Sequence, residues 1–149
     1  MYKLFSLVAL AILAVDQISK HLVLIYIPIG QRVVLWPSIL SLTHVRNTGA
    51  AFGWLEGKTA IFYGAVLLIM ATVIYFRRDI AAAGNLAVAS SALMTAGAIG
   101  NMVDRLRFQG EVVDFVSFSF FPFVFNVADS ALVVGAGLLM LCVARLELS

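Results

Sequence analysis

The sequence predicts an all-α membrane protein, a bundle of four transmembrane helices with a small β-rich region in its connections. Two observations carry this prediction. The 149 residues are 62% apolar and only 12% charged, with a mean hydropathy of +1.03, whereas a soluble domain typically carries about 25% charged residues. The apolar residues also gather in four long runs separated by more polar segments, as helices that cross a bilayer require.

The four predicted spans lie at about residues 4–27, 59–76, 86–104 and 126–145. About 20 helical residues cross a hydrocarbon core of roughly 30 Å, and helices are expected because backbone groups in lipid must pair internally. The first run follows Lys3 and imitates a secretory signal, but it continues past Asp16 and Lys20 and further apolar runs follow. We therefore expect a retained first span and a single membrane domain, residues 1–149.

The connections between these spans differ in character. Residues 28–58 are rich in β-branched and aromatic side chains and contain several glycines, so they could form a small sheet on the membrane surface. Residues 105–125 form a second connection, rich in valine and phenylalanine, whereas 77–85 is a short turn.

An up-and-down path through four spans brings nearly all polar features to one membrane face. The residues that we expect there are Asp16, Lys20, Asn47, Asn101, Asp104, Arg105, Asp114, Asn126 and Asp129. The orientation of this face is left open by composition. Six basic residues lie on its side against four on the other, which taken alone would put it in the cytoplasm, but basic residues paired within a site weaken that rule.

Asp16 and Lys20 lie deep in the first span. A charge at that depth seldom faces lipid and normally marks a cavity or a partner, and the spacing of four residues puts both side chains on one helix face. Two interpretations stay open, a structural ion pair that locks the helix into the bundle and direct contact with a ligand.

Three polar residues end the third span. Asn101 is an amide inside an apolar run, so it needs a hydrogen-bond partner. Asp104 precedes Arg105 directly, which favours a structural role for this carboxylate, and the arginine could equally reach the lipid headgroups.

The remaining two aspartates are the stronger candidates for chemistry. Asp114 lies between Val113 and Phe115, where desolvation should raise the pKa of its carboxyl. Asn126 and Asp129 have the spacing of a capping box at the start of the fourth span, which does not exclude chemistry. Two aspartates at a partly dry site can share one proton and activate water for peptide hydrolysis.

Other function classes have little support. The net charge of +2 and scattered basic residues give no reason to expect nucleic acid as a partner. Cys142 is the only cysteine, and His21 and His44 lie far apart, so we expect no disulfide, no metal and no cofactor. Ser90 lies in mid-span, where small residues usually pack, and offers no convincing nucleophile.

Five blocks in order resemble the lipoprotein signal peptidase family (signal peptidase II), and the resemblance spans residues 14 to 130. The blocks are Asp16-Gln17-Ile18-Ser19-Lys20, Arg46-Asn47-Thr48-Gly49-Ala50-Ala51-Phe52-Gly53, Gly100-Asn101-Met102-Val103-Asp104-Arg105, Val112-Val113-Asp114-Phe115 and Phe125-Asn126-Val127-Ala128-Asp129-Ser130. The Phe-rich segment 115–125 departs from the pattern, because it is more aromatic than expected before Asn126.

The resemblance implies an aspartic endopeptidase of the bacterial inner membrane. Its partners would be membrane lipid and prolipoproteins, which it would cleave on the N-terminal side of a diacylglyceryl-modified cysteine, as a monomer and without metal or cofactor. By matching motifs, Asp114 and Asp129 are the catalytic dyad. The residues that would bind substrate or support the site are Asp16, Lys20, Asn47, Gly49, Asn101, Asp104, Arg105 and Asn126.

The resemblance also implies an orientation, with the active site and the β-rich connections 28–58 and 105–125 outside the cytoplasm and both termini inside it. Two other functions are alternatives to a peptidase. A small proton-coupled transporter or channel subunit would also carry intramembrane carboxylates, but here they crowd one face and no internal repeat is present. A purely structural assembly factor would leave the buried polar residues without a role.

Overall fold

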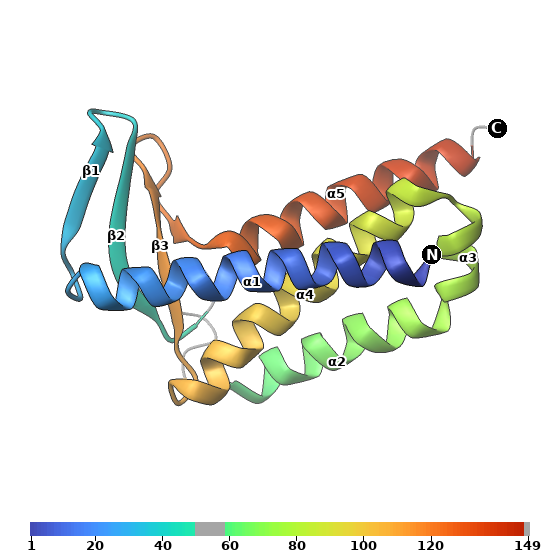
Figure 1. Cartoon of the computed structure of the whole chain (residues 1–149), viewed down its shortest axis with the longest axis horizontal. Coiled ribbons are helices and arrows are strands. Elements are labelled where there is room, and N and C mark those ends of the chain that lie inside the picture. The colour runs from blue at the N-terminus through green and yellow to red at the C-terminus, as the bar shows by residue number, and fades with distance from the viewer. Residues whose placement is uncertain (50–58, 148–149) are drawn as a thin grey trace.

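The computed structural model describes residues 1–49 and 59–147, and it places long helices side by side with a small sheet across one end (Figure 1). Both termini lie at the end away from the sheet. In chain order the elements are α1 (Tyr2–Tyr26), β1 (Arg32–Trp36), β2 (Leu40–Asn47), α2 (Thr59–Tyr75), α3 (Arg77–Ala82), α4 (Asn85–Arg107), β3 (Val112–Phe118), β4 (Val124–Phe125) and α5 (Val127–Glu147).

Three helices of the described ranges are long and apolar enough to cross a membrane, namely Tyr2–Tyr26, Asn85–Arg107 and Val127–Arg145. The fourth apolar helix, α2, has 17 residues, which is at the short end of the range of about 17–25 residues for a span. The short connection after α2 contains the six-residue helix α3, where the sequence indicated only a turn.

Helix α4 packs closely against its neighbours because small residues line it. A side chain at Gly100 would place its Cβ 2.6 Å from Asp16 Oδ2 of α1, and one at Gly97 would collide with the carbonyl oxygen of Ala128 in α5. In α5, a Cβ at Gly135 would come within 2.7 Å of the Ser90 carbonyl oxygen. The small side chains therefore allow the close helix contacts that membrane bundles require.

The sheet joins two segments that the sequence treated separately. Its four strands are antiparallel in the order β1-β2-β3-β4, so strands from the connection after α1 pair with strands from the connection after α4. The register sets Asn47 opposite Val112 and Val45 opposite Asp114. The predicted fold class is confirmed, a mostly helical membrane protein with a small β-rich region.

An apolar cluster fixes this sheet to the helices. Val23 and Ile27 at the end of α1 pack with Val113 and Phe115 of β3, all of them buried. The turn from α4 into β3 passes through Gly110, whose φ of +103° lies in the left-handed region that favours glycine. Because β3 is held against α1 on one face, its other face, with Asp114, is directed toward the helix ends.

Candidate active site

The polar residues predicted to share one face do meet at the sheet end of the bundle. They come from five elements, α1, β2, α4, β3 and α5, and form two adjoining groups. The first, which we name the ion cluster, consists of Asp16, Gln17, Lys20 and Asp104. The second, the carboxyl pair, consists of Asp114 and Asp129.

Lys20 is the centre of the ion cluster. Its Nζ lies 2.9 Å from Asp16 Oδ2 and 3.2 Å from Asp104 Oδ2, and it donates a hydrogen bond of 2.9 Å to Asn101 Oδ1. All three charged side chains are buried. The predicted Asp16–Lys20 pair is therefore present. Lys20 also connects α1 with α4, through its contacts with Asp104 and Asn101.

Asp104 forms its ion pair with Lys20 and not with Arg105, its neighbour in the sequence. Its Oδ2 also accepts a hydrogen bond of 3.0 Å from the backbone N–H of Val113. Adjacent residues on a helix point about 100° apart. The side chain of Arg105 is therefore directed away from the ion cluster. Its guanidinium lies over the ring of Phe62 in α2, with Cζ 3.9 Å from the ring centroid.

Gln17 was not among the predicted site residues, although it belongs to the ion cluster. Its Nε2 donates to Asp16 Oδ2 at 3.0 Å, to the Gly100 carbonyl oxygen at 3.2 Å and to Asp104 Oδ1 at 3.3 Å. The signal was available in the sequence, because an amide inside an apolar helix needs a partner, the same argument that identified Asn101.

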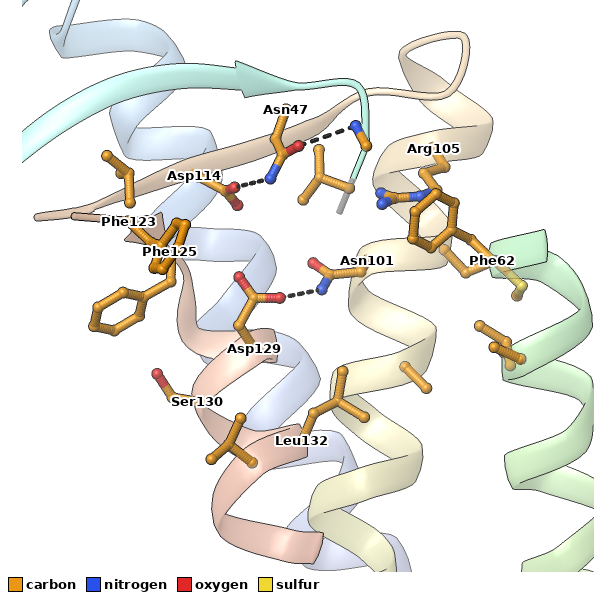
Figure 2. Close-up of a pocket in the computed structure, with 18 of the residues that line it drawn as sticks. Asn47, Phe62, Asn101, Arg105, Asp114, Phe123, Phe125, Asp129, Ser130 and Leu132 are labelled. Carbon is orange, nitrogen blue, oxygen red and sulfur yellow. Dashed lines mark hydrogen bonds between the residues drawn. The ribbon is translucent and has the colours of Figure 1, made fainter. Parts of the chain in front are cut away.

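Asp114 is held by two side-chain amides. Asn47 of β2 donates to Asp114 Oδ2 at 2.8 Å, and Asn126 donates to Asp114 Oδ1 at 2.7 Å. The backbone N–H of Gly49 donates to Asn47 Oδ1 at 3.0 Å, which turns the amide nitrogen of Asn47 toward the carboxyl (Figure 2). The carboxyl of Asp114 is therefore fixed between the sheet and the start of α5.

Asp129 is held in the first turn of α5. Asn126 and Asp129 form the predicted capping box, since the Asp129 N–H donates to Asn126 Oδ1 at 2.8 Å and the Asn126 N–H donates to Asp129 Oδ2 at 3.1 Å. Asn101 of α4 donates to Asp129 Oδ1 at 2.7 Å. Asn126 thus contacts both carboxyls and joins them into one unit.

The environment of Asp114 perturbs its ionisation. Burial raises the pKa of this carboxyl from 3.8 to about 7, and the charge of Asp129 acts in the same direction. The hydrogen bonds from Asn47 and Asn126 lower the pKa, as does Lys20, but they do not offset burial. A carboxyl with a pKa of about 7 can hold or release a proton near neutral pH.

A cavity of about 730 Å³ opens beside the carboxyl pair. Its walls come from α2, α4, α5 and the β3–β4 region, and the polar residues are gathered at its sheet end, as Figure 2 shows. Its polar lining consists of Asn47, Asn101, Arg105, Asp114, Asp129, Ser130 and Tyr63. Phe62 and Tyr63 of α2 line this cavity too, and nothing in the sequence distinguished them from other membrane-facing aromatics.

Arg105 is a buried cation directed to this cavity. Its side chain is 7% exposed, and within the described ranges its Nε and Nη1 atoms have no hydrogen-bond partner. Buried guanidinium groups are normally paired. The guanidinium places a positive charge in the wall of the cavity.

Comparison with known proteins shows the family of this chain. The family model described as "Signal peptidase (SPase) II" matches residues 8–145. The chain is 43% identical to the lipoprotein signal peptidase of Halalkalibacterium halodurans over 147 residues, 97% of this chain and 94% of that one. It is 44% identical to that of Shouchella clausii over 136 residues, covering 91% and 89% of the two chains. The chain belongs to the signal peptidase II family.

The fold is shared with a bacterial membrane enzyme of known structure. A bacterial membrane enzyme determined by the in meso method at 2.3 Å resolution superposes with a TM-score of 0.84 at 33% identity, covering 95% of this chain and 87% of the other. The chain is thus a multi-pass bacterial membrane protein with the activity of a lipoprotein signal peptidase, an aspartic peptidase. The predicted family and function are confirmed, and the transporter and assembly-factor alternatives are set aside.

Proposed function

We propose that Asp114 and Asp129 are the catalytic dyad of this signal peptidase, and that it cleaves prolipoproteins on the N-terminal side of a diacylglyceryl-modified cysteine. The observation that carries this proposal is that Asn126 bonds to both carboxyls, the buried one of Asp114 and the partly buried one of Asp129, at the polar end of the cavity. Two carboxyls that contact the same residue in a partly dry site favour a single shared proton over double ionisation.

The two carboxyls divide the chemistry of hydrolysis. Asp129 lies at the N-terminus of α5, where the helix dipole favours negative charge, and as the ionised member it accepts a proton from water. Asp114, with its raised pKa, is the protonated member and donates a hydrogen bond to the scissile carbonyl. The water oxygen bonds to the carbonyl carbon, the C–N bond then breaks, and a dyad proton passes to the departing amine.

The surrounding residues keep the dyad in place. Asn47, Asn101 and Asn126 orient the carboxyls through the hydrogen bonds described above, and Gly49 fixes Asn47. The ion cluster holds α1 and α4 together next to the dyad. Arg105 lines the cavity, and its positive charge attracts carbonyl oxygens of the bound substrate.

The apolar part of the cavity suits the substrate's own membrane segment. Val66 and Ile69 of α2 line it on one side and Leu132 and Val133 of α5 on the other, with Ala98 of α4 between them. A signal helix seated there would present its outer end to the carboxyl pair. The scissile bond would then lie where the bilayer meets water.

A cleavage assay on the purified protein tests the dyad. Asp114→Asn and Asp129→Asn should each abolish processing of a lipidated precursor in proteoliposomes, measured as a gel shift, while the proteins remain folded. Asp79→Asn is the matched control, because Asp79 is an exposed carboxylate of α3 at the opposite end of the bundle. Near wild-type processing by either dyad variant would contradict the assignment.

We also propose that the sheet end lies outside the cytoplasm, that both termini lie inside it, and that the protein acts as a monomer. In a Cys142→Ala background, a cysteine at Val34 of β1 should react with an impermeant maleimide in intact cells. A cysteine at Arg78 of α3 should react only after permeabilisation. The reverse pattern would overturn this orientation. Light scattering of the detergent complex would detect a dimer and contradict the monomer.

A further inference from the structure

A cluster of phenylalanine rings borders the cavity next to α5. Phe121 and Phe123 meet edge to face at 5.3 Å between ring centroids, and Phe121 and Phe125 at 6.2 Å. Phe118 extends the cluster, at 5.9 Å from Phe125 and 5.2 Å from Phe120. This segment is the one that departs from the family resemblance in its aromatic content.

Three of these rings form a continuous apolar surface that leads from the outside to the dyad. Phe121, Phe123 and Phe125, which we name the phenylalanine wall, line the cavity that also holds Asp114 and Asp129. Phe121 is 45% exposed and Phe120, beyond it, is 77% exposed, so the wall reaches the protein surface. In the view of Figure 2, Phe123 and Phe125 lie on one side of the carboxyls, and Phe62 and Arg105 lie on the other.

We propose that the phenylalanine wall binds the acyl chains of the substrate's lipid-modified cysteine and makes cleavage depend on their length. This inference rests on the proposed function, in which the modified cysteine directly follows the scissile bond. Its acyl chains therefore start within a residue of the dyad, and they need an apolar surface that begins there. The wall is such a surface, since it carries no charge and its rings can pack against acyl carbons beside the dyad.

The opposite sides of the cavity are suited to other parts of the substrate. The apolar part of the cavity, lined by Val66 of α2 and Leu132 of α5, is the part proposed above for the signal helix. The Arg105–Phe62 side carries a positive charge and therefore suits carbonyl oxygens better than acyl carbons. Of the three surfaces that adjoin the dyad, the phenylalanine wall is thus the one left for the acyl chains, and through Phe121 it continues to the exposed surface.

The test is a series of synthetic lipopeptides that differ only in acyl length. Each carries a cysteine with two chains of four, ten or sixteen carbons, in mixed micelles of fixed composition. For Phe121→Ala and Phe123→Ala, the KM for the sixteen-carbon substrate should rise about tenfold, whereas the KM for the four-carbon substrate should stay within about twofold. Phe123→Leu, which keeps most of the apolar area, should restore most of the affinity and guards against a folding defect.

Two phenylalanines of the same segment serve as matched controls. Phe118→Ala and Phe120→Ala alter rings that do not line the cavity, so neither should change the dependence of KM on acyl length. An equal rise of KM for all chain lengths, or the same effect from Phe120→Ala, would overturn the inference and indicate that the segment only anchors in the bilayer. Failure of the wild-type protein to cleave any substrate would instead count against the proposed function.

Discussion

The ion cluster and the carboxyl pair both contain aspartates at the sheet end of the molecule, but the aspartates of the two groups have different partners. Asp16 and Asp104 share the cation Lys20, which lies within 3.2 Å of both. Asp114 and Asp129 receive no direct salt bridge from the described residues and are held by the N–H groups of Asn47, Asn101 and Asn126.

This difference separates structural from chemical roles. A buried carboxylate with a bonded cation makes strong, directional contacts. A buried carboxyl held by amides keeps a raised pKa, as Asp114 does at about 7, and can exchange a proton. We therefore expect the ion cluster to determine stability and the carboxyl pair to determine the chemical step.

The largest effect is expected from comparing one carboxyl of each group. Asp114→Asn should lower kcat by roughly 10²–10⁴-fold, because it removes the proton donor, with little change in KM or in melting temperature. Asp104→Asn should instead destabilise the protein by about 1–3 kcal/mol, because it weakens the contacts with Lys20 and Val113, and should retain turnover per folded molecule. Melting temperature and single-turnover cleavage measured on both variants provide the test. A stable, inert Asp104→Asn beside a partly active Asp114→Asn would reverse the two roles.

A smaller effect is expected where the two helices of the ion cluster touch. Gly100→Ala would place a Cβ 2.6 Å from Asp16 Oδ2 and 3.3 Å from the Ala128 Cβ, so α1 and α4 must separate. We expect a loss of about 1–3 kcal/mol in the free energy of unfolding. Gly137→Ala in α5 is the control, because a Cβ there meets nothing within 4 Å. Thermal unfolding in detergent compares them, and an equally stable Gly100→Ala would show that this close contact does not matter.

The smallest effect concerns the pH dependence of cleavage. Since the dyad needs one proton, kcat/KM should fall as the pH rises through about 7, where Asp114 ionises. The hydrogen bond from Asn47 lowers the pKa of Asp114, so Asn47→Ala should raise it further and move the alkaline limb of the profile to higher pH. Asn85→Ala, at the other end of α4, should leave the limb in place. A shift to lower pH, or none, would count against Asp114 as the proton donor.

Local contacts within one helix or turn were predictable from spacing. The interval of four residues between Asp16 and Lys20 predicted their ion pair, and the interval of three between Asn126 and Asp129 predicted the reciprocal capping bonds. In both cases the helix period alone puts the two side chains within reach. The apolar nature of the four runs predicted the helical bundle in the same way.

Contacts between distant segments were not predictable in detail. The sequence suggested Arg105 as the cation beside Asp104, but Lys20, from another helix, takes that place. The bond between Asn47 and Asp114 joins residues 67 positions apart, and it depends on the register of β2 against β3. A shift of one residue in that register would turn Asp114 to the other face of the sheet.

The sequence by itself determined that this protein spans a membrane, that its polar residues gather at one end, and which family it resembles. The first two conclusions follow from composition, helix period and alternating topology, and the third from five short sequence blocks, and none of these depends on how the segments pack. Only the tertiary structure decided which carboxyls receive a cation and which receive amides. Those partners come from different helices and strands, and burial, which sets the pKa of Asp114, exists only once α1, α4, α5 and the sheet have packed together.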